Sequence, residues 1–154
     1  MSGKADLDYR NLLQEVERAL AGEDPLARAV EVLQRVPHYS WVGIYLLEGE
    51  ELVLGPWKGP AATEHVRIPI GVGICGAAAK TGRTEVVDDV SSDPRYLACF
   101  PSTRAEMVVP ILDGGRVLGE IDVDSDLPAA FSERDREFLE EVARLLAPRI
   151  KEGR

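Results

Sequence analysis

The chain has 154 residues, a formal net charge of −9, 45% hydrophobic residues and 29% charged residues. This length and composition are typical of a single globular domain with its own core. The negative charge argues against binding to nucleic acids, whose affinity for proteins depends on Lys and Arg, and against attachment to anionic membrane surfaces. No apolar run is long enough to cross a bilayer, and residues 1–6 lack the apolar core of a signal peptide. The composition therefore predicts a cytoplasmic protein.

Helices are expected at both ends of the chain. An apolar repeat of about four residues predicts a helix over 6–21, and Asp24 with Pro25 begins a second helix that Pro37 stops. Near the C-terminus, Ser132 with Asp135 three residues later has nearly the pattern of a capping box that opens the last helix. The apolar faces of these helices would cover a sheet or pair with a second subunit, so a homodimer is possible.

Between the helices the pattern is typical of short strands. Segments rich in β-forming residues lie at 40–47, 52–54, 66–70 and 84–87. Residues 106–112 and 116–124 form two more, joined by Asp-Gly-Gly, a strong hairpin signal. A short Ala-rich helix follows residue 71, and 91–103 is expected to be irregular. The sequence predicts an α+β fold with a mainly antiparallel sheet flanked by N- and C-terminal helices.

The two cysteines, Cys75 and Cys99, are the candidate reactive groups. In a reducing compartment such thiols are buried or redox-active, and a structural disulfide is less common. Together with His38 and His65 they have no spacing typical of a four-ligand metal site, so no metal is predicted.

Cys75 lies within Gly-Val-Gly-Ile-Cys-Gly (71–76), which matches the dinucleotide-binding pattern G-x-G-x-x-G. The flanking strands read as hairpins, however, so the glycines are expected to permit a tight turn and close packing. A thiol at the start of a helix has its thiolate favoured by the helix dipole.

Cys99 is expected in the irregular segment near Arg95 and Arg104, which could lower the pKa of its thiol. The alternative is that Cys99 is a small buried hydrophobic residue.

Three carboxylates fall on one face of the last predicted hairpin. A three-residue loop would place Glu106 opposite Asp122, with Asp124 one step further along the same face. Such crowding raises at least one carboxyl pKa, so one acid could donate a proton while the others hold a substrate ammonium. Alternatively these residues form the solvated face that antiparallel sheets often have. Trp41 and Tyr45 share a strand face and are expected in the core or in the wall of an apolar pocket.

Seven segments resemble the GAF domain family and, within it, the free methionine-(R)-sulfoxide reductases. The resemblance is strongest over residues 40–145, and residues 1–154 are expected to form a single GAF domain. The matching segments are Trp-Val-Gly-Ile-Tyr-Leu (41–46), Leu-Val-Leu-Gly-Pro-Trp-Lys-Gly (52–59), Val-Arg-Ile-Pro (66–69), Gly-Ile-Cys-Gly-Ala-Ala (73–78), Ala-Cys (98–99), Ala-Glu-Met-Val-Val-Pro (105–110) and Asp-Val-Asp-Ser (122–125).

The resemblance implies a six-stranded antiparallel sheet, a closed small-molecule pocket and a thiol mechanism without a cofactor. Cys99 would attack the sulfoxide sulfur while a protonated carboxyl supplies a proton. The resulting sulfenic acid would condense with Cys75, and thioredoxin would reduce the disulfide. The implied binding site for free methionine sulfoxide, or another amino-acid-like ligand, consists of Trp41, Tyr45, Glu106, Asp122 and Asp124.

The sequence departs from this family pattern at three positions. His65 stands where a resolving cysteine is usual, Phe100 replaces an Asp after Cys99, and Ser91 replaces a His. These departures favour an alternative function, that of a non-catalytic GAF module that binds a small molecule or senses redox state.

Overall fold

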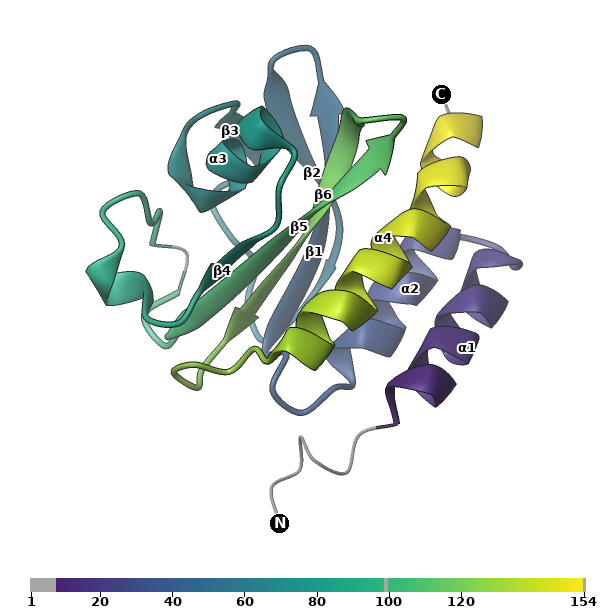
Figure 1. Ribbon diagram of the computed structural model, residues 1–154, viewed down its shortest axis with the longest axis horizontal. Helices are drawn as coiled ribbons and strands as arrows, with labels where there is room; N and C mark the ends of the chain where they lie inside the picture. The colour runs from purple at the N-terminus through teal and green to yellow at the C-terminus, as the bar shows by residue number, and fades with distance from the viewer. Residues whose placement is uncertain (1–7, 99, 154) are drawn as a thin grey trace.

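The computed structural model describes residues 8–98 and 100–153. Its centre is a six-stranded sheet with the order β3-β2-β1-β6-β5-β4, and all neighbouring strands are antiparallel (Figure 1). The predicted α+β class is therefore confirmed. The strands are β1 (Trp41–Glu48), β2 (Glu51–Lys58), β3 (Arg67–Pro69), β4 (Glu85–Val87), β5 (Ala105–Asp113) and β6 (Arg116–Ser125).

The helices cover the two faces of the sheet unequally. Three of them pack on one face, and the shortest lies on the other with the segment that leads to β5 (Figure 1). They are α1 (Tyr9–Leu20), α2 (Pro25–Gln34), α4 (Glu133–Glu152) and, on the second face, α3 (Gly73–Thr81); a 3-10 turn, η2 (Val90–Ser92), follows β4. Among the residues described, no helix combines the length and apolar character that a membrane crossing requires.

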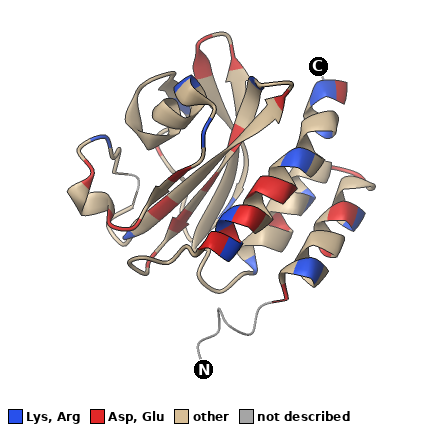
Figure 2. Ribbon diagram, in the orientation of Figure 1, with Lys and Arg blue, Asp and Glu red and all other residues tan. Residues whose placement is uncertain are grey.

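The main hydrophobic core lies between the sheet and the helices α1, α2 and α4. Alternate residues of the central strands enter it, because side chains along a strand point to opposite faces. Examples are Ile44 of β1, Met107 of β5 and Ile121 of β6, all fully buried. The intervening residues of the same strands must face α3. Charged residues lie along the helices and also within the central strands (Figure 2).

The β5–β6 hairpin differs from the predicted register. Gly114 and Gly115 both have positive φ angles, as a two-residue hairpin turn requires, so Asp113 pairs with Arg116. A bulge between Ile111 and Leu112 shifts the register further. Glu106 therefore lies opposite Asp124, and the predicted pairing with Asp122 is wrong. Because the total shift is two residues, the carboxylates remain on one face.

The glycine-rich segment 71–76, which includes the first turn of α3, serves packing. The strands on either side of it, β3 and β4, lie at opposite edges of the antiparallel sheet, so no dinucleotide-binding unit is formed. A Cβ atom at Gly76 would lie 2.7 Å from the carbonyl oxygen of Pro69. Gly73 has a positive φ angle of 71° and faces Leu97. The glycines thus permit a tight turn and the close approach of α3 to β3.

A buried carboxylate fixes the start of α4 to the rest of the helical layer. Ser132 and Asp135 form a capping box, as predicted. The Oδ1 atom of Asp135 also lies 2.8 Å from His38 Nε2 and accepts hydrogen bonds from the hydroxyls of Tyr39 (2.7 Å) and Tyr9 (2.9 Å). Although burial opposes ionisation, these hydrogen bonds hold the pKa of Asp135 below its usual value.

Replacing this carboxylate should destabilise the protein. We expect Asp135→Asn to lower the free energy of unfolding by roughly 3 kcal/mol at pH 7, because a buried, hydrogen-bonded charge is lost. A lowered folded-state pKa stabilises the protein above the unfolded-state value and ceases to do so as the pH falls. The difference between wild type and variant in urea unfolding should therefore shrink below about pH 4. Glu137→Gln, an exposed change on the same helix, should have little effect at any pH.

Candidate active site

Four carboxyl groups form a buried row on the face of the sheet that α3 covers. Glu120, Asp122 and Asp124 occupy alternate positions of β6, and Glu106 of β5 lies opposite Asp124. We call these four residues the acid row. Their exposed fractions are between 0% and 5%. The alternative prediction, in which Glu106, Asp122 and Asp124 form a solvated face of the sheet, is therefore wrong. Glu120 was not foreseen, although continuing the alternation backwards from Asp122 would have found it.

Several oxygens of the acid row have no partner. Both carboxyl oxygens of Glu120, Oδ1 of Asp122 and Oδ1 of Asp124 are buried without a hydrogen bond. In residues 8–98 and 100–153, none of the ion pairs involves these three side chains. Buried polar groups are normally paired, and exceptions are frequent at functional sites.

Burial is the main influence on the protonation of the acid row. It raises the pKa values of Glu120, Asp122 and Asp124 above the usual range, and the charge of Asp122 adds to the effect on Glu120 and Asp124. The expectation that crowded carboxyls have a raised pKa is confirmed in direction, with loss of hydration as its larger cause.

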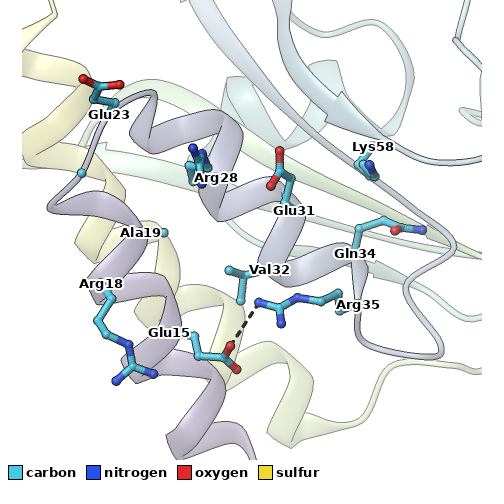
Figure 3. Close-up of a pocket in the computed structure, with 11 residues that line it drawn as sticks. Glu15, Arg18, Ala19, Glu23, Arg28, Glu31, Val32, Gln34, Arg35 and Lys58 are labelled. Carbon is cyan, nitrogen blue, oxygen red and sulfur yellow. Dashed lines mark hydrogen bonds and ion pairs between the residues drawn. The ribbon is translucent and has the colours of Figure 1, made fainter.

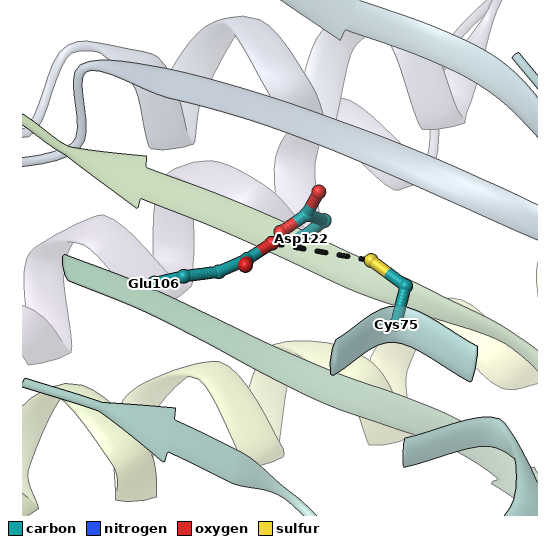
Figure 4. Close-up of side chains that lie close together, drawn as sticks. All are labelled: Cys75, Glu106 and Asp122. Carbon is teal, nitrogen blue, oxygen red and sulfur yellow. Dashed lines mark hydrogen bonds between the residues drawn. The ribbon is translucent and has the colours of Figure 1, made fainter. Parts of the chain in front are cut away.

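Cys75 contacts the acid row from α3, the helix that covers this face of the sheet. It lies in the first turn of α3, and its Sγ atom donates a long hydrogen bond of 4.0 Å to Oε2 of Glu106 (Figure 4). Burial raises the pKa of this thiol, and the four carboxyl groups raise it further. The prediction that the helix dipole favours a thiolate at Cys75 is therefore wrong for this structure, because burial and negative charge outweigh the dipole.

Cys99 lies outside the described residues. Arg95, which was expected to influence it, is held by other carboxylates: its guanidinium contacts Asp93 at 2.6 Å and Glu85 at 3.0 Å. These ion pairs raise the pKa of Arg95.

Aromatic side chains border the acid row on β1. Trp41 lies opposite Asp124 and Tyr45 opposite Glu120. The Trp41 indole donates to the carbonyl of Ala61 at 3.2 Å, and the Tyr45 hydroxyl donates to the carbonyl of His65 at 2.7 Å. Both aromatic residues are buried, so their polar atoms fix the loop between β2 and β3 over this face.

Gly43 determines where the Trp41 ring lies. A Cβ atom added at Gly43 would lie 2.7 Å from Cζ3 of the indole, so only glycine lets the ring cover the strand at this position. Gly43 is the partner of Asp122 on β6, and the ring of Phe100 lies 5.8 Å from that of Trp41. The indole and Phe100 thus form an apolar wall beside the carboxylates.

The space at this site is small. A cavity of about 10 Å³ is lined by Tyr45, Ile68, Ile74, Cys75, Leu97, Glu106 and Asp122. Such a volume holds about one water molecule.

A much larger hollow of about 750 Å³ lies between α1 and α2, where an ion pair joins Glu15 to Arg35 (Figure 3). It contains none of the predicted site residues.

Removing one carboxyl should reveal the cost of burying the row. Glu120 has a raised folded-state pKa, so its contribution to stability is lost as the pH rises above the unfolded-state value of about 4.3. We expect Glu120→Gln to be more stable than wild type at pH 8 and little changed near pH 4.5, because burial raises the pKa of the Glu120 carboxyl. Thermal unfolding over this pH range measures it, with the exposed Glu50→Gln as control. Identical pH dependence in wild type and Glu120→Gln would contradict the prediction.

Sequence and structure comparisons agree on the family of this chain. Residues 22–150 match the model of the GAF domain. The chain is 37% identical to GAF domain-containing protein A of Dictyostelium discoideum, over 94% of this chain and 93% of that protein. It is 32% identical to the free methionine-R-sulfoxide reductase of Escherichia coli, over 87% and 83%.

The structural comparison reaches the same family. The free methionine-R-sulfoxide reductase of Neisseria meningitidis, solved in complex with its substrate, superposes with a TM-score of 0.88 at 41% identity, covering 98% of this chain and 92% of that one. With the six-stranded antiparallel sheet, its helices and the match over residues 22–150, this chain belongs to the GAF domain family.

Proposed function

We propose that this protein reduces free methionine-(R)-sulfoxide to methionine by thiol chemistry. The observation that carries the proposal is the acid row, whose buried and partly unpaired oxygens lie beside the Cys75 thiol and an aromatic wall. The similarity to reductases of this substrate in Escherichia coli and Neisseria meningitidis supports it. A free amino acid brings an ammonium group that can compensate the buried carboxylates, which a peptide-bound residue lacks.

In the first step, the thiolate of Cys99 attacks the sulfur of the sulfoxide. The sulfur–oxygen bond of the substrate breaks, a new sulfur–oxygen bond forms on Cys99, and methionine is released, which leaves Cys99 as a sulfenic acid once the oxygen is protonated. The departing oxygen needs a proton. Asp122 and Asp124 are suited to supply it, because burial raises their pKa values and each holds its proton to a higher pH than an exposed carboxyl does.

In the second step, Cys75 attacks the sulfenic sulfur. A sulfur–sulfur bond forms and the sulfenic sulfur–oxygen bond breaks. A base must take the thiol proton of Cys75 and pass it to the hydroxyl, which leaves as water. Glu106 is placed for this role, since its Oε2 atom accepts the hydrogen bond of the thiol. Thioredoxin then reduces the disulfide to two thiols and is itself oxidised, so the cycle needs no bound cofactor.

Substrate binding must enlarge the site. The cavity beside Cys75 holds about one water molecule, whereas free methionine sulfoxide is far larger. Leu97 lines this cavity from the segment before β5 and is only half-buried. Its displacement would open the space between Cys75 and the acid row.

A second candidate function is a GAF module that binds or senses a small molecule without turnover. It is favoured by one observation, namely that Cys75 is a buried thiol with a raised pKa and hence a slow nucleophile in this conformation. Residue 65, where the family pattern has a resolving cysteine, is His65, and its carbonyl accepts the hydrogen bond of Tyr45, so this position offers no thiol.

The reaction can be tested by counting methionine. We expect purified reduced protein to convert free methionine-(R)-sulfoxide repeatedly when thioredoxin is regenerated, and Cys75→Ser to stop after about one methionine per subunit, because its sulfenic acid has no intramolecular partner. Cys99→Ser should form none. Methionine-(S)-sulfoxide is the matched control substrate. A wild-type protein that forms no methionine would exclude the reductase and leave the binding module.

The acid row can be tested separately. We expect Asp124→Asn to lower kcat/KM for methionine-(R)-sulfoxide by about 10²- to 10⁴-fold, the range for loss of a proton donor. The comparison variant is Asp126→Asn, because Asp126 is exposed two residues further along and lies outside the row. Equal steady-state rates for the two variants would remove Asp124 from the mechanism.

A further inference from the structure

One oxygen of each of two carboxyl groups converges with a sulfur atom in the interior. The Sγ atom of Cys75 and carboxyl oxygens of Glu106 and Asp122 all lie within 4.8 Å of one another, and all three residues are buried (Figure 4). They come from α3, β5 and β6, so three separate elements hold them. We propose that these three residues form a binding site for a thiophilic divalent cation of the Zn²⁺ class.

The one donor separation that is known individually requires little adjustment, and the other two are at most 4.8 Å. With Zn–S near 2.3 Å and Zn–O near 2.1 Å, a sulfur and an oxygen on a tetrahedral zinc lie about 3.6 Å apart. The separation of Cys75 Sγ and Glu106 Oε2 is 4.0 Å, so a shift of about 0.4 Å brings this pair into range. The cavity of about 10 Å³ that both residues line with Asp122 has room for an ion.

The unpaired oxygens supply a second, independent observation. Oδ1 of Asp122 and Oδ1 of Asp124 are completely buried without a hydrogen-bond partner, and Asp122 itself lines the cavity. The ion pairs found in the described parts of the chain leave both residues without a cationic neighbour. A cation at this point would compensate buried negative charge that no Lys or Arg of residues 8–98 and 100–153 compensates.

The donor set determines which cations fit. A thiolate is a soft ligand that selects Zn²⁺ and similar ions, whereas Mg²⁺ and Ca²⁺ prefer oxygen ligands alone. Three protein ligands leave a fourth position to water, as in open zinc sites. Cation binding would release the thiol proton of Cys75 and any carboxyl proton to solvent, so the oxidation states of metal and protein do not change.

Occupation of this site would withdraw Cys75 from disulfide formation. This consequence rests on the proposed reductase function, but the binding itself does not. A bound cation would also take the charge that a substrate ammonium is proposed to meet. Disulfide formation and cation binding would therefore compete for the same thiol, that of Cys75.

Co²⁺ alone is the probe, and the protein is the Cys99→Ser variant, in which only Cys75 can supply a thiolate. We expect a thiolate-to-Co²⁺ charge-transfer band in the near ultraviolet that saturates at one equivalent and disappears when Zn²⁺ is added. Excess Mg²⁺ should leave it unchanged. The added change Cys75→Ser should abolish the band. Asp122→Asn should retain it but weaken the Kd at least about tenfold, whereas the exposed Asp126→Asn should not.

Each variant is first compared with its parent by thermal unfolding without metal, so that loss of the fold is recognised. The absence of a band in the Cys99→Ser protein would overturn the proposal, as would a band that survives Cys75→Ser or an unchanged Kd in Asp122→Asn. Methionine formation is measured with the wild-type protein in separate, metal-free samples. Activity without a Co²⁺ band therefore refutes only the cation site, and a band without activity refutes only the reductase.

Discussion

The properties of the candidate site depend on the burial of four carboxyl groups on one face of the sheet. An ionised carboxylate removed from water costs several kcal/mol unless a counter-charge or hydrogen bonds compensate it. Glu120, Asp122 and Asp124 have no ion pair among the described residues, and burial raises their pKa values. Without a ligand, protons reduce this charge. An ammonium group or a metal ion that entered the site would compensate the same negative charge in place of the protons. Protons and cations would therefore compete for the acid row.

Asp135 shows the same physical rule with the opposite outcome. It is as buried as Asp122, but it receives hydrogen bonds from Tyr9 and Tyr39 and contacts His38. Its pKa is lowered where that of Asp122 is raised. The difference lies in the partners, because the two carboxyls belong to different layers. On the face covered by α1, α2 and α4, the buried carboxylate Asp135 has hydrogen-bond partners next to the main core. On the face covered by α3, carboxyl oxygens of the acid row are unpaired beside the Cys75 thiol.

Local patterns in the sequence predict most of the fold. The capping box at Ser132, the alternation along β1 and the turn at Gly114 each depend on neighbouring residues. The register of Glu106 was missed because the turn has two residues where three were expected, and because a bulge within β5, which depends on cross-strand pairing, shifts the register again. Whether the acid face is wet or buried could not be predicted either, since α3 covers it from outside the hairpin. Here only the family resemblance implied a closed pocket.

The reactivity of Cys75 is coupled to the charge of the acid row. Its position at the start of α3 would favour a thiolate on an exposed helix, yet burial next to the acid row holds the proton on sulfur. A thiol that reacts only when a carboxylate accepts its proton is linked to the charge of that row. In the proposed cycle the acid row gives one proton to the sulfoxide oxygen, and Glu106 passes the Cys75 proton on to the hydroxyl that leaves as water. The row therefore ends one proton short and regains that proton from solvent. A cation bound between Cys75 and Asp122 would interrupt both transfers, because it displaces the protons that they exchange.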